Sequence, residues 1–169
     1  MKKLLLFQII LLSVIILFFS CLKKEEYSIV PVIKFKSLIK IDNATGIDDK
    51  GLLTLTFTDG DGDIGLNPDD TTGIYSKDSL YNCNFFIKYF EKQKGKFKEI
   101  VLPLKNNSRI PFISVTGKNK NIKGEIEIEL YINNYTSAYD TILFEAYIVD
   151  RALHKSNIIK TPEIIIKKK

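Results

Sequence analysis

Hydrophobic and polar residues alternate with a period of two along most of the chain after residue 28. Apolar side chains at every second position are typical of β-strands that bury one face. Clusters rich in glycine and asparagine separate these runs, as turns and loops require. The predicted strands lie within residues 29–41, 53–58, 85–89, 97–104, 125–130, 142–148 and 158–166.

These segments predict an all-β fold, because none of them has the periodicity of an amphipathic helix. About seven short strands joined by turns are typical of an antiparallel immunoglobulin/fibronectin-like sandwich. The segment AYIVDRALHKSN, residues 146–157, resembles the penultimate strand and following hairpin of bacterial immunoglobulin-like domains. The chain has no tryptophan, so the Cys–Trp–Cys pattern of antibody domains is absent. We expect one sandwich domain over residues 28–166 and a basic tail at 167–169.

The chain begins with an apolar run that does not fit the sandwich. Residues 4–19 are almost entirely apolar, and two lysines precede them. This length and these flanks predict a secretory signal peptide over residues 1–20. The sequence LFFSC, residues 17–21, resembles the lipobox of bacterial lipoproteins, in which the cysteine thiol accepts a diacylglyceryl group. The resemblance implies a covalent lipid on Cys21. The alternative is an uncleaved helical anchor with an incidental cysteine.

A charged stretch follows Cys21 and would form a lipidated tether over residues 21–27. Lys24, Glu25 and Glu26 resemble the surface-export signal of Bacteroidota lipoproteins, in which a lysine and two acidic residues follow the lipidated cysteine. The resemblance implies that the protein is lipid-anchored in the outer membrane and faces the cell surface. The alternative is a solvated tether that carries no export information.

The net positive charge of the chain equals the charge of the lysines at its two ends. The formal charge of the whole chain is +5, but cleavage before Cys21 would remove two lysines, and the basic tail holds three more. Nucleic-acid binding is disfavoured, because it needs lysines and arginines clustered on one face. Lipidation of Cys21 would leave Cys83 without a disulfide partner within the chain, and we expect Cys83 to be a small buried side chain.

The most unusual segment is FTDGDGDIGLNPDD, residues 57–70, in which Asp59, Asp61 and Asp63 alternate with glycines directly after a predicted strand. Calcium prefers about six to eight oxygen ligands on a flexible loop, and such spacing lets carboxylates converge. The spacing equals that of the first ligands of an EF-hand. However, Ile64 stands where that loop needs glycine, and no helices flank the segment, so it is not an EF-hand.

The predicted fold suggests a fourth ligand. In an immunoglobulin-like sandwich, the loop after the second strand and the hairpin after the penultimate strand lie at the same end. Asp150, in that hairpin, would then approach the aspartate loop. Our hypothesis is a structural Ca²⁺ site formed by Asp59, Asp61, Asp63 and Asp150. The alternative is a turn in which aspartate side chains only cap backbone N–H groups.

The phrase LTFTDGDGDIGL, residues 55–66, together with IVDRALHKSN, residues 148–157, resembles a family of uncharacterised Bacteroidota outer-membrane lipoproteins. The resemblance covers most of the chain after the signal peptide. It implies the outer-membrane location and the sandwich fold, and it brings no established activity.

The residues offer little for catalysis, and we predict no catalytic residue. His154 is the only histidine, no G-x-S-x-G motif occurs, and zinc would need more histidine or cysteine ligands. The alternating glutamates of segment 125–129 are expected to form a solvated strand face, with a basic partner as the alternative. Five tyrosines near loops could stack on sugars, although packing at the rim of the sandwich is favoured. They are Tyr75, Tyr81, Tyr131, Tyr135 and Tyr139.

Three hydroxyl residues, each preceded by an aspartate, resemble the O-glycosylation pattern of Bacteroidota; they are Thr71, Ser79 and Thr141. Taken together, the sequence predicts a noncatalytic, surface-displayed lipoprotein that acts as a binding or scaffolding module for a protein or glycan partner. The alternative is an accessory carbohydrate-binding protein or a hydrolase of the outer membrane.

Overall fold

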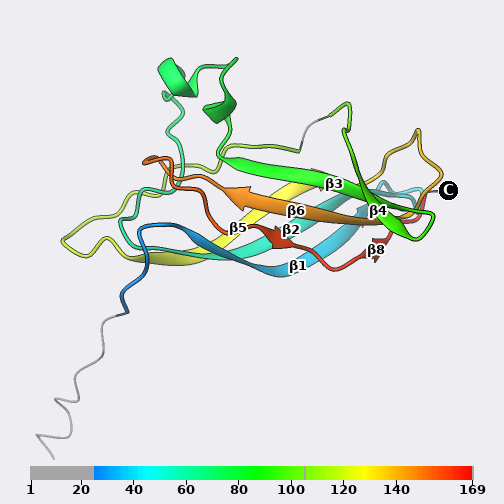
Figure 1. The fold of residues 1–169 in the computed structure, drawn as a ribbon, viewed down its shortest axis with the longest axis horizontal. Helices are drawn as coiled ribbons and strands as arrows, with labels where there is room; N and C mark the ends of the chain where they lie inside the picture. Colours follow the sequence, from blue (N-terminus) through cyan, green and yellow to red (C-terminus); the bar gives the residue numbers. More distant parts are fainter. Residues whose placement is uncertain (1–24, 105, 169) are drawn as a thin grey trace, which may run out of the picture.

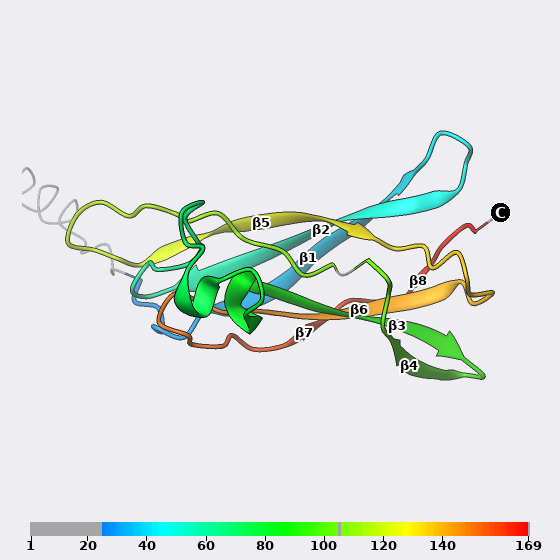
Figure 2. The same cartoon turned by 90° about the horizontal axis from the view of Figure 1, so that it is seen from above.

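Two antiparallel β-sheets pack face to face in the computed structural model, which describes residues 25–104 and 106–168. The first sheet has the strand order β1-β2-β5, and the second has the order β4-β3-β6-β7, with β8 also paired to β6 (Figures 1 and 2). The strands are β1 Val32–Asp42, β2 Asp48–Asp59, β3 Phe85–Gln93, β4 Lys96–Ile100, β5 Ile122–Tyr131, β6 Thr141–Ile148, β7 Ile159–Lys160 and β8 Ile164–Ile165.

The predicted all-β sandwich is confirmed, with eight strands in place of about seven. The predicted last strand, 158–166, is divided into β7 and β8, and Pro162 lies between them. Proline has no N–H group to donate to a ladder, which accounts for the break. Within the described part of the chain, the helical segments are two short 3₁₀ turns, η1 Gly73–Tyr75 and η2 Leu80–Asn82. The predicted signal peptide, Cys21 and Lys24 lie outside the described residues.

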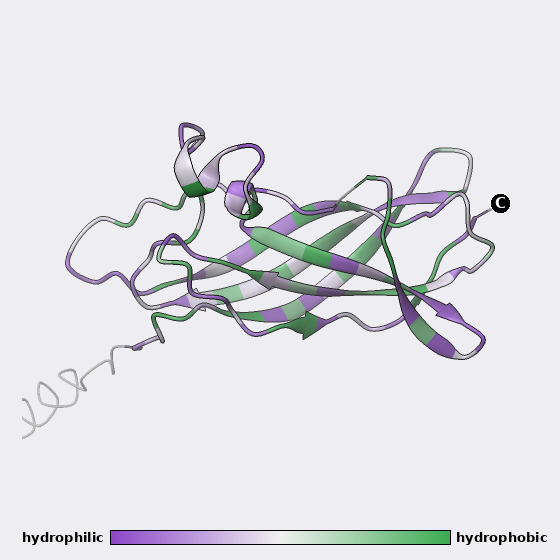
Figure 3. Ribbon diagram, turned by 45° about the horizontal axis from the view of Figure 1, so that its top comes forward, coloured by the Kyte–Doolittle hydropathy of each residue, from purple (hydrophilic) through white to green (hydrophobic). Residues whose placement is uncertain are grey.

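The core lies between the sheets and is built from the alternating apolar positions that the sequence predicts. In Figure 3, hydrophobic and hydrophilic bands alternate along the strands. Leu55 of β2 pairs with Ile126 of β5, and Phe57 lies over Gly124, where a Cβ atom would come within 3.0 Å of the ring. Burial of such side chains is the main stabilising contribution, at about 25 cal/mol per Å² of apolar surface.

The glutamates of β5 lie on the outer face of the three-stranded sheet, as predicted. Glu125 pairs with Lys36 and Glu129 pairs with Lys50, each at 2.6 Å. Such exposed ion pairs contribute little, typically below about 1 kcal/mol. This face is therefore a solvated surface on which two of the glutamates already have basic neighbours within the chain.

Asparagine side chains occupy the outer edges of the same sheet. The Asn157 amide accepts from the N–H of Ile33 and donates to its carbonyl, at 2.8 and 2.9 Å. The Asn106 amide bonds Tyr131 of β5 in the same way, with both distances 2.9 Å. Each amide stands in for one residue of a neighbouring strand, so it satisfies edge groups that would otherwise be open to pairing.

The C-terminal residues are held against the sandwich. The N–H of Asp48 donates to the Lys167 carbonyl at 2.9 Å, and the Asp48 carboxylate accepts from the N–H of Lys167 at 2.7 Å. The Lys168 ammonium donates to the carbonyls of Asn134 and Ser137. Two residues of the predicted basic tail are thus part of the packed domain, and Lys169 lies outside the described residues.

Residues 67–82, called here the excursion, lie between the end of β2 and the start of β3 and carry both 3₁₀ turns. Figures 1 and 3 show this segment standing out from the sandwich. Neither turn contains a buried residue. Apolar burial therefore does not hold these turns in place, and polar contacts must do so.

Candidate metal centre

Four aspartates meet at one end of the sandwich. Asp59 is the last residue of β2, Asp61 and Asp63 lie in the turn that follows, and Asp150 follows β6 by two residues. One carboxylate oxygen from each lies within 4.8 Å of the other three. The structure thus brings together all four residues of the predicted metal site. They meet because the loop after β2 and the hairpin after β6 lie at the same end of the sandwich.

The aspartate turn is built by capping bonds. Asp59 is fully buried, and its Oδ2 accepts from the N–H groups of Gly62 at 2.7 Å and Asp63 at 3.3 Å. Gly62 has φ of +68°, and a Cβ atom there would come within 2.5 Å of the Lys120 carbonyl oxygen. Only glycine fits this left-handed, crowded position. The capping interpretation of the turn is therefore correct as far as one oxygen of Asp59 is concerned.

The other two capping carboxylates belong to the hairpin contact. Asp63 Oδ2 accepts from the N–H of Ala152 at 2.9 Å. Asp150 Oδ1 accepts from the N–H of His154 at 2.7 Å, and its Oδ2 lies 3.0 Å from His154 Nδ1. The bond from Ala152 to Asp63 joins the hairpin to the aspartate turn, and the bonds from His154 to Asp150 stabilise the hairpin itself.

Capping leaves the inward oxygens without partners. Oδ1 of Asp59, Asp61 and Asp63 are all buried and receive no hydrogen bond in the part of the chain that the structure describes. Burying an unpaired charged oxygen is costly, by several kcal/mol for an ion without compensation. The carboxylate of Asp61 differs from the other three because no described residue caps it. Turn formation alone does not account for its inward position.

Electrostatics within the cluster disfavour four negative charges. Burial, followed by the charges of Asp61 and Asp63, raises the pKa of Asp59 to about 6. Burial also raises the pKa of Asp63, with Asp150 and Asp61 adding to the effect. The pKa of Asp150 is raised by burial, which the bonds from His154 oppose. A divalent cation between the inward oxygens would compensate this charge and supply the missing partner.

His154 lies in the predicted hairpin and supports Asp150. Leu153 before it has φ of +69°, and the N–H of Asp150 donates to the His154 carbonyl, which closes the hairpin. The imidazole Nδ1 lies within hydrogen-bonding distance of Asp150 Oδ2. Its role in this geometry is to position a carboxylate.

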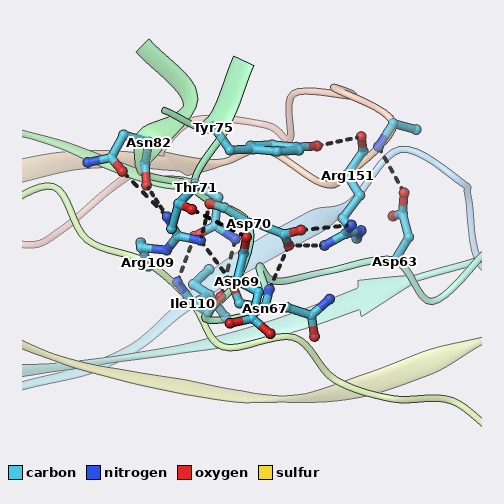
Figure 4. Close-up of polar contacts among 12 residues, drawn as sticks. Asp63, Asn67, Asp69, Asp70, Thr71, Tyr75, Asn82, Arg109, Ile110 and Arg151 are labelled. Atoms are coloured by element: carbon cyan, nitrogen blue, oxygen red, sulfur yellow. Dashed lines mark hydrogen bonds and ion pairs between the residues drawn. The ribbon is translucent and has the colours of Figure 1, made fainter. Parts of the chain in front are cut away.

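Arg151 joins the aspartate turn to the excursion. The sequence analysis did not predict a role for this residue. Its N–H donates to the Asp63 carbonyl at 3.2 Å, and its guanidinium binds the Asp70 carboxylate with both terminal nitrogens (Figure 4). The Arg151 carbonyl accepts from the Tyr75 hydroxyl at 3.1 Å. The hairpin that carries Asp150 therefore holds the first part of the excursion.

Arg109 holds the excursion from the other side. Its guanidinium donates to the carbonyls of Asn67 and Asp70 at 2.9 and 3.0 Å, and to the carbonyl of Asn82 at 3.2 Å (Figure 4). Arg109 and Arg151 are the only arginines in the sequence, and both serve the excursion. Only two of the 25 basic residues are arginines, and this scarcity could have indicated a structural role for both. Arginine binds several acceptors in a fixed geometry, which lysine does not.

Glu91 is a second residue that sequence reasoning missed. It is buried at the opposite end of β3 and accepts bonds from Tyr89, Gln93, Asn134 and Ser137. These contacts organise the loop of residues 133–139. Its position in phase with the inward-facing residues of β3 was the signal, because a charged residue on a buried face needs partners.

The remaining predicted residues do not form one site. The candidate glycosylation residues are separate, with Thr71 exposed, and Ser79 and Thr141 half-buried. Tyr75 and Tyr81 belong to the excursion, whereas Tyr131, Tyr135 and Tyr139 lie at the opposite end. Cys83 is half-buried, so it is less enclosed than expected.

The predicted export signal is described only in part. The Glu25 carboxylate pairs with Lys123 at 2.8 Å, and Glu26 is exposed. None of the helical segments in the described ranges is long and apolar enough to cross a membrane. Comparison with protein-family models, with curated proteins and with solved structures found no match to this chain.

Proposed function

We propose that this chain is a noncatalytic, lipid-anchored β-sandwich module of the outer membrane, displayed at the cell surface, whose loop end is organised by a structural Ca²⁺ ion. It acts by binding or scaffolding a protein or glycan partner. The observation that carries the proposal is the convergence of three buried, unpartnered carboxylate oxygens from Asp59, Asp61 and Asp63.

The size of the cluster favours calcium. No two of the four ligand oxygens are more than 4.8 Å apart, which is about twice a typical calcium–oxygen distance of about 2.4 Å, so their spacing is compatible with ligands around one calcium ion. Magnesium needs about 2.0–2.1 Å and a near-ideal octahedron, and it gives up its waters reluctantly. A set of four carboxylates, two of them buried and two half-buried, therefore suits calcium better than magnesium.

A noncatalytic role is supported by how the acidic and basic groups are used. The aspartates turn their oxygens toward one another, and three of the four cap backbone N–H groups. His154 Nδ1 lies 3.0 Å from Asp150 Oδ2, so the ring is engaged with a carboxylate of the cluster. A hydrolase would need a nucleophile or an acid–base pair facing a substrate cleft.

The alternative of an accessory carbohydrate-binding protein has one observation in its favour. A hollow of about 250 Å³ at the end opposite the metal centre is lined by Leu104, Tyr131 and Tyr135, among others. Tyrosine rings can stack on sugar rings. The Tyr135 hydroxyl, however, already donates to Asp49 at 2.8 Å.

Calcium titration calorimetry on the soluble chain from residue 22 onward tests the proposal. We expect saturable binding of one Ca²⁺ per chain and no comparable heat with Mg²⁺. Asp61→Asn should weaken binding at least about tenfold, because it removes a ligand charge without removing a capping bond. Asp69→Asn, an exposed neighbour on the same loop, is the matched control and should bind as the unmodified chain does. Absence of binding to the unmodified chain would leave the aspartate loop as a turn only.

A further inference from the structure

The first described residues lie at the metal end of the sandwich. The Glu25 carbonyl accepts from the Asn121 amide at 2.7 Å, and the N–H of Tyr27 donates back to Asn121 at 3.3 Å. Lys123 pairs with the Glu25 carboxylate and is the second residue of β5. Ile122, the residue before it, pairs with Asp59 of β2. The chain therefore enters the domain at the end where β5 begins, on the left of Figure 2, which is also the end of the aspartate cluster.

The distance from Cys21 to this point is limited by covalent geometry. Three residues lie between Cys21 and Glu25. The four Cα–Cα steps between them span at most about 3.6 Å each, or roughly 14 Å in all. The twelve residues of β2 extend roughly 40 Å from the metal end to the opposite end. A lipid on Cys21 therefore keeps the metal end within about 14 Å of the membrane surface.

The surface at this end has the chemistry of a membrane contact. The loop of residues 114–121 projects beyond the sheets there, and it carries the exposed lysines Lys118 and Lys120 (Figure 2). Ile29 and Val30, just after the tether, are 54% and 39% exposed. Glu25, which is exposed at the same end, is paired with Lys123, whereas Glu26 is exposed. Exposed basic and apolar side chains at one end suit an interface with anionic headgroups, where each lysine near the surface adds attraction.

We propose that the end of the sandwich with the aspartate cluster contacts the membrane surface, with loop 114–121 and Ile29–Val30 docked against anionic lipid headgroups. The inference rests on the proposed lipid anchor at Cys21. In this orientation the opposite end, which carries the β3–β4 turn and the hollow lined by Tyr131 and Tyr135, faces away from the membrane.

Lysine acetylation read by mass spectrometry tests this orientation. The lipidated chain is inserted into preformed vesicles of phosphatidylcholine with phosphatidylglycerol, and the Cys21→Ser chain in solution is the reference. We expect Lys118 and Lys120 to react at least about threefold more slowly on the vesicles, because the surface covers them. Lys94 and Lys96, at the β3–β4 turn, should react at unchanged rates. Vesicles of phosphatidylcholine alone should give weaker protection of the loop.

Three results would overturn the orientation. Protection of Lys94 and Lys96 would place the opposite end at the membrane. Protection centred on Lys36 or Lys88, on the outer faces of the two sheets, would show a domain lying on its side. Co-flotation of the chain with vesicles and no protection at any lysine would leave the anchor intact and remove the docking. Failure of the lipidated chain to float would contradict the anchor itself, and with it the proposed function.

Discussion

At the scale of single residues, the four aspartates have unequal roles. Asp59, Asp63 and Asp150 each cap a backbone N–H with one oxygen, so each stabilises the local turn even without a cation. Asp61 has no such bond among the described residues, and its Oδ1 is buried. Without a cation its charge only repels its neighbours. Asp61 is therefore the residue at which a metal site and a simple turn predict opposite effects.

Asp61→Asn should raise the unfolding temperature of the calcium-free protein, because it removes one of the converging charges. The expected gain is roughly 1–2 kcal/mol, from charges a few ångströms apart in an intermediate dielectric. The same variant should lose most of the stabilisation that calcium gives the unmodified chain. Thermal unfolding in EDTA and in excess Ca²⁺ measures both effects. A variant that is less stable than the unmodified chain in EDTA would mean that Asp61 has a structural partner.

Asp48 lies at the other end of the sandwich, and its pKa predicts how the stability of the fold depends on pH. Burial by itself would raise the pKa of Asp48, but the Lys40 ammonium and the N–H of Lys167 outweigh it and hold the pKa below its ordinary value of 3.8. A carboxyl group with a lowered folded-state pKa stabilises the fold above the unfolded value, and this contribution is lost as the pH falls through the folded value.

Asp48→Asn should therefore cost about 1–3 kcal/mol at pH 7, the usual loss for a buried hydrogen-bonded charge. The difference from the unmodified chain should shrink below pH 3.8, where protonation begins to remove the same contribution. Denaturant unfolding at pH 7 and at successively lower pH checks this. A difference that stays constant down to pH 2 would rule out the ionised carboxylate as its source.

At the scale of elements, period-two alternation is a strong signal, because a one-residue shift would expose every core side chain of a strand. It predicts β2, β5 and β6 from Leu55, Ile126 and Phe144 and their alternate neighbours. It did not predict the division of segment 158–166, where β-branched residues on both sides of Pro162 looked continuous. Nor did it predict how the excursion is held, since the contacts of Arg109 and Arg151 depend on segments far apart in sequence.

The excursion gives a prediction at this scale. Arg151→Gln removes the ion pair with Asp70, while the backbone bond from residue 151 to Asp63 stays. Amide exchange in residues 67–75 should become about tenfold faster, as expected for loss of a charge-assisted bidentate contact of roughly 1.4 kcal/mol. Calcium affinity should change little.

Lys155→Gln is the matched control, because Lys155 lies in the same hairpin but contacts the Tyr147 ring and has no ion pair with Asp70. It should leave exchange in residues 67–75 unchanged. Equal acceleration in both variants would point to general loosening of the hairpin. A large loss of calcium affinity in Arg151→Gln would show that the guanidinium, and not only the backbone, supports the metal centre.

At the scale of the whole molecule, the sandwich has two different ends. The aspartate cluster, the excursion and the first described residues share one end, and Glu91 organises a polar loop at the other. The meeting of Asp150 with the aspartate loop followed from the expected fold, because sandwich topology fixes which loops share an end. Glu91 could not be placed in the same way, since its partners come from a loop whose path no alternation pattern specifies.

Calcium should stabilise the entire domain, because the ion would join the ends of both sheets. A ligand at about 100 times its dissociation constant adds roughly 2.7 kcal/mol, which corresponds to roughly 5–10 °C for a domain of this size. Scanning calorimetry with Ca²⁺ and then with excess EDTA measures the shift, and Asp69→Asn should show it in full. A shift below 1 °C at saturating calcium would remove the ion from any structural role.

The measurement that tests the central claim most directly is a crystal structure of the soluble domain grown with Ca²⁺, with anomalous differences recorded. The account predicts one strong anomalous peak about 2.3–2.6 Å from carboxylate oxygens of Asp59, Asp61, Asp63 and Asp150. Absence of that peak, with the inward oxygens bonded to waters or to one another, would contradict it.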